Sequence, residues 1–157
     1  MGVVTTQLAI LVGLPAAGKT TFARQHGVDW VVLEADAFAP DYRGFWEMVE
    51  AVAAKRRDYP RASNSRVMLD GTFHRRRARE RAVGLFKPYV RAIAYVFDTG
   101  LDECLQRNAR RRKVYPESEV FRKANSYEGV ALAEGFEEIY RVRAANGDFV
   151  VELVLGR

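Results

Sequence analysis

The stretch GLPAAGKT, from Gly13 to Thr20, decides the fold. It fits the pattern G-x-x-x-x-G-K-[ST], in which glycines let the backbone wrap around a phosphate and point successive amides at it. The apolar run QLAILVG precedes it at 7–13, and a helical pattern follows it over about 18–26. A buried strand, a glycine loop and a helix N-terminus in this order make an anion site, so the stretch predicts a cradle for a nucleoside triphosphate.

The last two residues of this loop have the most specific expected roles. Lys19 is expected to reach the β- and γ-phosphates as a point charge, and the Thr20 hydroxyl is expected to ligate Mg²⁺. The predicted cofactors are therefore ATP or another NTP, together with Mg²⁺. The loop residues expected to hold the nucleotide are Gly13, Ala16, Ala17, Gly18, Lys19, Thr20 and Thr21.

Apolar runs alternate with helical patterns along the rest of the chain. Strands are expected at about 7–13, 30–34, 66–70, 91–97 and 138–143. Helices are expected at about 18–26, 42–57, 75–86, 101–112 and 117–124. This rhythm predicts an α/β fold of the P-loop NTPase kinase type, with a parallel five-stranded sheet flanked by helices on both faces. A last apolar run at 148–155 follows the turn signal Asn146-Gly147 and predicts an edge strand.

Length and composition limit the class of protein. The chain has 157 residues, of which 48% are hydrophobic and 29% charged, and this predicts a single P-loop kinase domain over 1–157. No apolar stretch approaches the roughly eighteen residues of a membrane span. The single cysteine, Cys104, is expected to be a reduced core thiol, which favours a cytoplasmic location. The net charge of +5 permits a polyanionic partner without requiring one.

Two aspartates follow predicted strands, where open α/β sheets place their chemistry. Asp36 comes directly after WVVLEA, and Asp70 closes RVMLD. Asp36 is the expected general base for an acceptor hydroxyl, with Glu34 as a weaker rival. Asp70 is expected to order the Mg²⁺ shell. The alternative is that each aspartate only forms a turn or caps a helix.

A basic run lies between Gln106 and Val114, where five basic side chains have no acidic residue among them. Arg107 and Arg111 are four apart, so on a helix they share a face. The run is either a solvated helix end favoured by the helix dipole or a lid that brings cations to the transferring phosphoryl group. The P-loop favours the lid, in which Arg111 assists transfer.

A second basic run, HRRRARER, covers 74–81. Its arginines at 75, 76 and 79 either line a helical face that holds the phosphates of a polynucleotide or belong to a solvated helix with Glu80 as a compensating charge. A group of aromatic residues after Asp36 has a similar ambiguity, because it either stacks on a terminal base or packs in the core. The group consists of Phe38, Tyr42, Phe45 and Trp46.

These motifs together resemble the polynucleotide 5′-hydroxyl kinase family. The segment VFDTGLDECLQRNARRRKVYPESEV looks like the lid region of these enzymes, which has an R-N-x-x-R core and a proline before the next helix. The resemblance extends to GLPAAGKTTFAR and LDGTFHRRRARER. It also includes LAEGFEEIYRV, which is similar to the L-A-E-G-F segment of the animal enzymes' kinase domain. Nearly the whole chain is covered in matching order.

The resemblance implies transfer of the γ-phosphate of an NTP to a 5′-hydroxyl end of DNA or RNA, with Mg²⁺. It places Lys19 and Thr20 on the phosphates and the metal, Asp36 as the general base, and Asp70 beside the P-loop. Arg107 and Arg111 would clamp the nucleotide phosphates. Nucleic acid 5′ ends are then the expected partner, and no phosphatase or ligase region is present, so a repair or ligase partner would supply the other steps of end repair.

The acceptor side departs from the family pattern at one position. Many members have an arginine three residues after the base, which grips the phosphate next to the acceptor hydroxyl, whereas this chain has Ala39. Arg43 is the nearest arginine that can substitute for it. The residues expected on the acceptor side are Arg43, Asp70, Thr72 and Arg76.

Two other functions stay open. The DGTF-x-R-R segment is shared with small kinases fused to other catalytic domains, so a small-molecule or nucleoside kinase on the same fold is an alternative. A nucleotide-binding regulator or toxin-like module would bind ATP with little acceptor turnover, and the two strand-end aspartates and the lid argue against it. A switch GTPase is disfavoured because the chain has no N-K-x-D segment to recognise guanine.

Overall fold

The computed structural model describes residues 6–58, 66–88 and 90–156, and one six-stranded sheet runs through them in the order β2-β3-β1-β4-β5-β6. The strands are β1 (Thr6–Val12), β2 (Val31–Glu34), β3 (Arg66–Asp70), β4 (Val90–Phe97), β5 (Glu138–Ala145) and β6 (Asp148–Gly156). The first five are parallel, and β6 pairs antiparallel with β5. The predicted fold is confirmed, and the expected edge strand adds a sixth, antiparallel member to the sheet.

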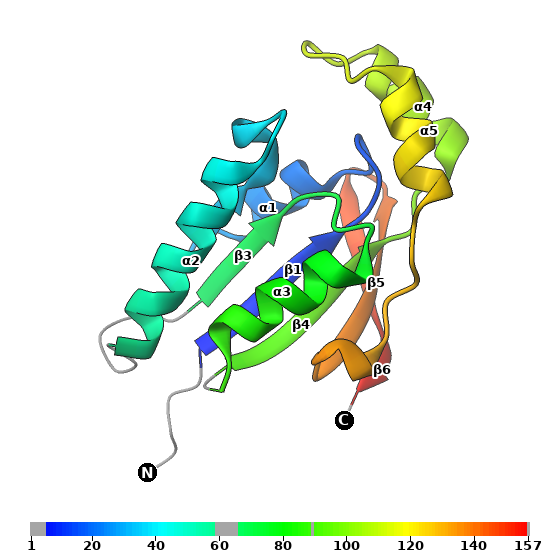
Figure 1. Ribbon diagram of the computed structural model, residues 1–157. Helices are drawn as coiled ribbons and strands as arrows, with labels where there is room; N and C mark the ends of the chain where they lie inside the picture. The colour runs from blue at the N-terminus through cyan, green and yellow to red at the C-terminus, as the bar shows by residue number, and fades with distance from the viewer. Residues whose placement is uncertain (1–5, 59–65, 89, 157) are drawn as a thin grey trace.

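Helices cover both faces of this sheet (Figure 1). The helices are α1 (Lys19–His26), α2 (Arg43–Asp58), α3 (Arg76–Phe86), α4 (Leu101–Ala109) and α5 (Glu117–Asn125), with 3-10 turns η1 (Ala35–Phe38) and η2 (Leu132–Glu134). Side chains of β1 alternate between the faces: Leu8 and Ile10 pack with α2 and α3, whereas Ala9 and Leu11 pack with α1. Because β1 is buried on both sides, its sequence is almost entirely apolar.

The parallel strands bring their carboxyl ends to one edge of the sheet. The P-loop follows β1 at this edge, η1 follows β2, and Thr72 follows β3. The segment after β4 forms α4 and α5, which stand beyond the same edge (Figure 1). Chain segments far apart in sequence therefore meet here, at the place where open α/β sheets bind ligands.

Helix α4 is shorter than the sequence predicts. The expected helix covers 101–112, but α4 ends at Ala109. The buried Asn108 explains the difference: its amide donates to the carbonyl oxygen of Tyr115 at 2.8 Å, and its oxygen accepts from the Tyr115 amide at 3.0 Å. These two bonds turn the chain back on itself, so the prediction that Arg107 and Arg111 share one continuous helical face is wrong.

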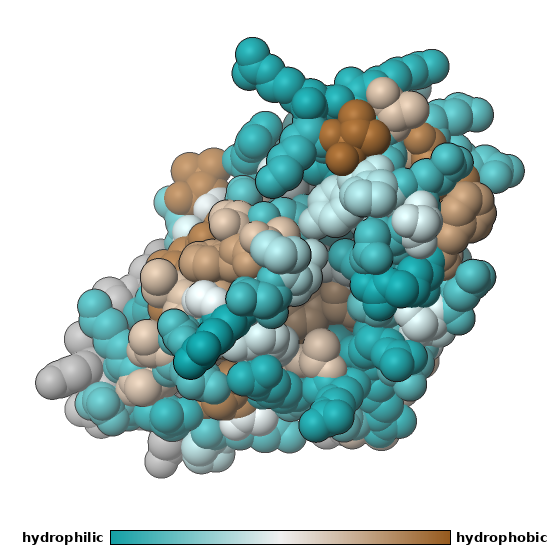
Figure 2. All heavy atoms as spheres, turned by 45° about the horizontal axis from the view of Figure 1, so that its top comes forward, coloured by the Kyte–Doolittle hydropathy of each residue, from teal (hydrophilic) through white to brown (hydrophobic). Residues whose placement is uncertain are grey.

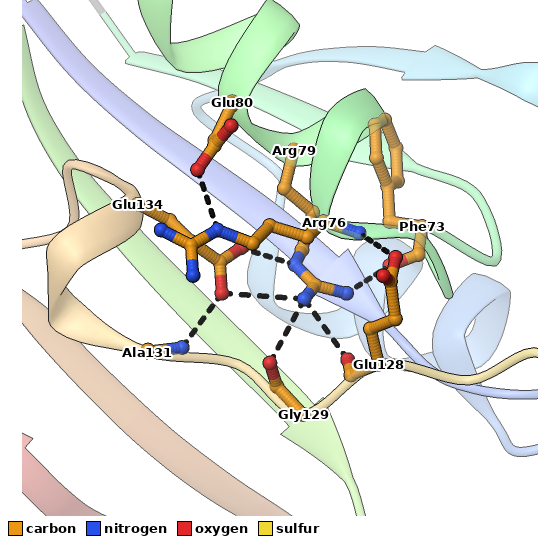
Figure 3. Close-up of polar contacts among 8 residues, drawn as sticks. All are labelled: Phe73, Arg76, Arg79, Glu80, Glu128, Gly129, Ala131 and Glu134. Atoms are coloured by element: carbon orange, nitrogen blue, oxygen red, sulfur yellow. Dashed lines mark hydrogen bonds and ion pairs between the residues drawn. The ribbon is translucent and has the colours of Figure 1, made fainter.

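A buried ion pair joins α3 to η2 (Figure 3). The side chains of Arg79 and Glu134 are both 0% exposed, and Arg79 Nε lies 2.5 Å from Glu134 Oε1. Arg79 also donates to the carbonyl oxygens of Phe73, Glu128 and Gly129 at 2.7, 2.9 and 3.1 Å. Arg79 is therefore a structural residue, and both alternatives stated for it, a helical face that holds polynucleotide phosphates and a solvated helix, are wrong.

Two expectations from composition can be compared with the structure. Cys104 is buried in the cluster that packs with α1, as expected for a core thiol. Of the helices within the described ranges, none is long and apolar enough to cross a bilayer.

Candidate active site

The P-loop curls between β1 and α1. Its backbone needs unusual torsion angles at Gly18, with φ of 104°, and at Ala16, with φ of 67°. The amide of Gly13 donates to the carbonyl oxygen of Thr72 at 3.1 Å, which ties the loop to the end of β3. The loop lines a pocket of about 360 Å³, here called the phosphate pocket. Its lining residues are Pro15, Ala16, Gly18, Lys19, Thr20, Thr21, Asp36, Asp70, Thr72, Arg107 and Arg111.

Lys19 is buried at the floor of the phosphate pocket, with 7% of its surface exposed. Its Nζ donates to the carbonyl oxygens of Gly13 and Leu14, both at 2.8 Å. Burial lowers the pKa of Lys19 to about 8, although Asp70 and Asp36 act to raise it. A phosphate group in the pocket would supply the negative charge that these carbonyl groups supply only in part.

Thr20 and Asp70 place hard oxygen atoms next to each other. Thr20 Oγ1 donates to Asp70 Oδ2 at 2.9 Å, and burial raises the pKa of Asp70 against the opposing effects of Lys19 and the Thr20 hydrogen bond. A hydroxyl and one carboxylate suit Mg²⁺, which commonly takes its other ligands from water and substrate phosphates. The described residues contain no cluster of three or more carboxylate, histidine or cysteine ligands, so such an ion would depend on the nucleotide.

Asp36 lies in η1 and has a partner that the sequence did not indicate. The hydroxyl of Tyr115 donates to Asp36 Oδ1 at 2.7 Å and lies 3.4 Å from the hydroxyl of Tyr42. Burial and these two neighbours raise the pKa of Tyr115, which therefore stays a donor. The expected general base is thus hydrogen-bonded to the end of the lid, a contact between residues 79 positions apart that no linear pattern predicts.

The lid arginines reach the phosphate pocket from two different elements. Arg107 lines it from α4, and Arg111 lines it from the loop that follows. No acidic residue lies within the basic run itself, but Arg107 Nη2 lies 2.6 Å from Oε1 of Glu103, one helical turn before the run. An exposed pair of this kind contributes little free energy, so it does not prevent Arg107 from binding phosphate.

A second pocket, of about 270 Å³, opens on the other side of Asp36. We call it the aromatic pocket, because Tyr42, Phe45, Trp46 and Phe73 line it. Its basic lining residues are His74, Arg75, Arg122 and Lys123. Asp36 and Thr72 line both pockets. A carboxylate therefore stands between a phosphate cradle and a cavity suited to an organic acceptor.

Not every predicted site residue is brought to these pockets. Arg43 pairs with Glu47 at 3.2 Å, and 83% of its side chain is exposed. Arg76 pairs with Glu80 at 2.6 Å. Neither arginine lines the phosphate pocket or the aromatic pocket. Figure 2 shows this end of the molecule as a largely hydrophilic surface with smaller hydrophobic areas among the polar side chains.

Some residues that line the pockets were not predicted from the sequence. Some predicted residues lie in the core or outside the pockets instead. Lys123 and Arg122 belong to a helix for which the sequence indicated no function. Of the expected aromatic group, Phe45 is 2% exposed and is both core and pocket wall, whereas Phe38 lines neither pocket. Ala17 is buried in the core behind the P-loop.

Comparison with known proteins agrees with this architecture. A family model described as "AAA domain" matches residues 8–127, and no curated protein matches the chain significantly. One similar structure is the Pnkp1/Rnl/Hen1 complex, 28% identical over 71% of this chain with a TM-score of 0.55. This chain spans only 40% of the chain that it matches in that complex.

Two further structures share the fold over most of their length. A gluconokinase from Sinorhizobium meliloti 1021 is 15% identical, with a TM-score of 0.59, over 93% of this chain and 86% of its own. Kti12 of Chaetomium thermophilum, in complex with ADP-AlF3, is 16% identical, with a TM-score of 0.62, over 87% of this chain and 88% of its own. At these identities the likeness shows a common fold and leaves the substrate open.

Proposed function

The chain belongs to the AAA domain family, and we propose that it is a polynucleotide 5′-hydroxyl kinase with a P-loop kinase fold. It transfers the γ-phosphate of ATP or another NTP to the 5′-hydroxyl end of DNA or RNA. The observation that carries the proposal is the position of Asp36, which lines both the phosphate pocket and the aromatic pocket. A general base in that position can meet an acceptor hydroxyl beside the γ-phosphate.

The transfer step follows from these groups. Asp36 accepts the proton of the acceptor hydroxyl while that oxygen forms a bond to the γ-phosphorus. The bond from the γ-phosphorus to the β,γ-bridging oxygen breaks, and the nucleoside diphosphate leaves with the electron pair. Lys19 and the lid arginines offset the negative charge on the transferring group. Thr20 and Asp70 would hold Mg²⁺, which when bound neutralises phosphate charge.

The nucleic acid acceptor has three supports. The lid and the L-A-E-G-F segment resemble polynucleotide kinases, the Pnkp1/Rnl/Hen1 complex is similar to the chain, and the aromatic pocket combines rings that can stack on a base with cations that can bind phosphate. The name of that complex lists three components. We propose that this kinase also acts together with other proteins, in keeping with the repair or ligase partner that the family resemblance implies.

A small-molecule acceptor is the second candidate. The gluconokinase of Sinorhizobium meliloti 1021 and a sugar kinase from Janibacter sp. HTCC2649 match the chain over 93% and 88% of its length. A cavity of about 270 Å³ is also large enough for a sugar or a nucleoside alone.

The deciding experiment supplies the protein with ATP labelled at the γ-phosphate and with Mg²⁺. Acceptors are oligonucleotides with a 5′-hydroxyl or a 5′-phosphate, as DNA and as RNA, beside a panel of nucleosides and sugars. Label is expected mainly on the 5′-hydroxyl oligonucleotides, with much weaker transfer to nucleosides and none to sugars or 5′-phosphate ends, and Asp36→Asn is expected to lose transfer while still binding ATP. Label on a sugar or nucleoside alone would replace the proposal with the second candidate.

A further inference from the structure

The aromatic pocket holds a buried cation that the transfer step does not use. Lys123 of α5 is 6% exposed. Its Nζ donates to the Thr72 hydroxyl at 3.2 Å and lies 5.2 Å from the ring centroid of Tyr115 and 5.9 Å from that of Tyr42. Among the residues that the structure describes, no carboxylate is within ion-pair distance of it.

The hydrogen bonds of this ammonium group are incomplete. It has three donors, and one of them has an oxygen acceptor within the described part of the chain. Aromatic faces stabilise a buried cation in part, but burial without a carboxylate still costs free energy. Lys123 is therefore arranged to gain from an anion that arrives with a ligand.

The other charged groups of the pocket also favour an anion. Arg75 and Arg122 line it together with Lys123, and the facing acids are Asp36 and Asp41. His74 stays neutral near pH 7, because burial and repulsion from Lys123, Arg122 and the nearby arginines lower its pKa to about 4. Three cations thus line the pocket with two carboxylates, one of which is the expected general base. Arg122 also pairs with Glu119 at 2.8 Å, but its side chain is 61% exposed, so this pair contributes little free energy and does not prevent Arg122 from binding an anion.

We infer that Lys123 binds a phosphate group of the acceptor, next to the hydroxyl that is phosphorylated. The inference rests on the proposed function and deepens it: at a 5′-hydroxyl end, this group is the phosphodiester of the terminal nucleoside. A phosphate monoester on a small molecule offers the same chemistry. The acceptor therefore carries an anion, and its hydroxyl meets Asp36 while the phosphate meets Lys123.

This assignment also explains how the chain can bind the acceptor phosphate although it has Ala39 where many polynucleotide kinases have an arginine. No arginine stands three residues after Asp36, and the nearest substitute, Arg43, is exposed and paired with Glu47. Lys123 enters the same pocket from α5, the helix that follows the lid. One chain segment then carries both the arginines of the nucleotide side and the lysine of the acceptor side.

The test measures kcat/KM with ATP and Mg²⁺ for three acceptors: thymidine, thymidine 3′-monophosphate and a 5′-hydroxyl oligothymidylate. The unaltered protein is expected to prefer both phosphate-containing acceptors over thymidine by at least about tenfold, the effect of a charge-assisted hydrogen bond. Lys123→Gln is expected to remove this preference, so that kcat/KM for the two phosphate-containing acceptors falls relative to kcat/KM for thymidine. Lys123→Arg restores it in part, and the matched control Lys55→Gln, an exposed lysine of α2, leaves it unchanged.

Each failure has a distinct meaning. Equal kcat/KM of the unaltered protein for thymidine and its 3′-monophosphate overturns the inference without any variant. Oligonucleotide transfer that Lys123→Gln leaves unchanged overturns the inference while the proposed function stands, and loss of the preference in Arg43→Gln instead assigns the role to Arg43. Transfer to thymidine 3′-monophosphate but not to the oligothymidylate, dependent on Lys123, supports the inference and overturns the polynucleotide acceptor.

Discussion

Two buried cations show how differently this chain treats positive charge. Arg79 has a carboxylate and three carbonyl oxygens as partners, all supplied by the protein. Lys19 has two carbonyl oxygens and no carboxylate within ion-pair distance among the described residues. A cation whose partners are complete holds the fold together, whereas a cation that lacks an anion is available for a ligand. This difference identifies functional cations better than the density of basic residues does.

The Arg79 environment explains a motif that the sequence related only to a family. In the L-A-E-G-F segment, the Glu134 carboxylate accepts hydrogen bonds from the Arg79 guanidinium. It also accepts one from the Ala131 amide at 2.7 Å. Gly135 has φ of 112°, and a Cβ there would lie 2.8 Å from Cγ1 of Val83. The segment is thus built to bring one carboxylate to α3. Because Arg79 also binds the Phe73 carbonyl, the pair positions a wall of the aromatic pocket.

The comparison predicts its largest effect at Lys19. Lys19→Ala should lower transfer by about 10³-fold or more, because a cation facing the transferring phosphoryl group is removed. The free energy of unfolding should not fall, because the substitution removes a buried charge without breaking an ion pair. Transfer assays beside urea unfolding measure both. A large loss of stability would show that Lys19 is a structural cation like Arg79.

Arg79→Ala should have the opposite profile. It leaves the Glu134 carboxylate buried without its partner, which typically costs about 3–5 kcal/mol in unfolding free energy. The double variant Arg79→Met, Glu134→Leu should recover much of that loss, since both charges are removed together. Urea unfolding of the single and double variants measures the effect. A loss below about 1 kcal/mol in Arg79→Ala would contradict the structural role.

The features that could be predicted from the sequence are those that depend on local backbone pattern and burial. GLPAAGKT and the buried strand before it specify local backbone and burial, so the P-loop and the sheet are predictable. The positions of Asp36 and Asp70 at the sheet edge are predictable because parallel strands place their carboxyl ends together, whereas their catalytic roles stay predictions. These inferences need only periodicity and the known topology of open sheets.

The parts that were missed depend on contacts between distant segments. Arg79 differs from its neighbours in HRRRARER only because Glu134, 55 residues later, reaches it. Helix α4 ends early because Asn108 binds the backbone of Tyr115. Lys123 sits in an ordinary amphipathic helix, and its burial beside Thr72 follows from tertiary packing.

Arg111 is a second cation that we expect to be available for a ligand, and its substitution should have a smaller effect than that of Lys19. Arg111→Ala should lower kcat/KM for transfer by at least about tenfold, since one phosphate contact is lost. Stability should change by no more than about 0.5 kcal/mol, because its loop position includes no buried ion pair. Arg112→Ala, in the same loop but outside the phosphate pocket, is the matched control. An unchanged rate in Arg111→Ala would contradict the lid interpretation and favour the alternative, in which the basic run is only a solvated helix end.

The smallest effect that we predict is the change of ATP affinity with pH. An arginine keeps its charge at any pH near neutrality, whereas Lys19 has a pKa of about 8. Between pH 7 and 8.5 the charged fraction of Lys19 falls about fourfold, so ATP affinity should fall by about the same factor. In Lys19→Met, the ATP affinity should not change over this pH range once the titration of ATP itself is subtracted.

Stability should move in the opposite direction over the next pH range. The folded pKa of Lys19 lies below the ordinary value of 10.5, so between about pH 8 and 10.5 the unfolded chain binds the proton that the folded chain has lost. Stability therefore rises with pH across this range. The stability difference between the unaltered protein and Lys19→Met isolates this change from other titrating groups. If ATP affinity and stability fell together, Lys19 would not be a cation that awaits phosphate, and its contrast with Arg79 would be lost.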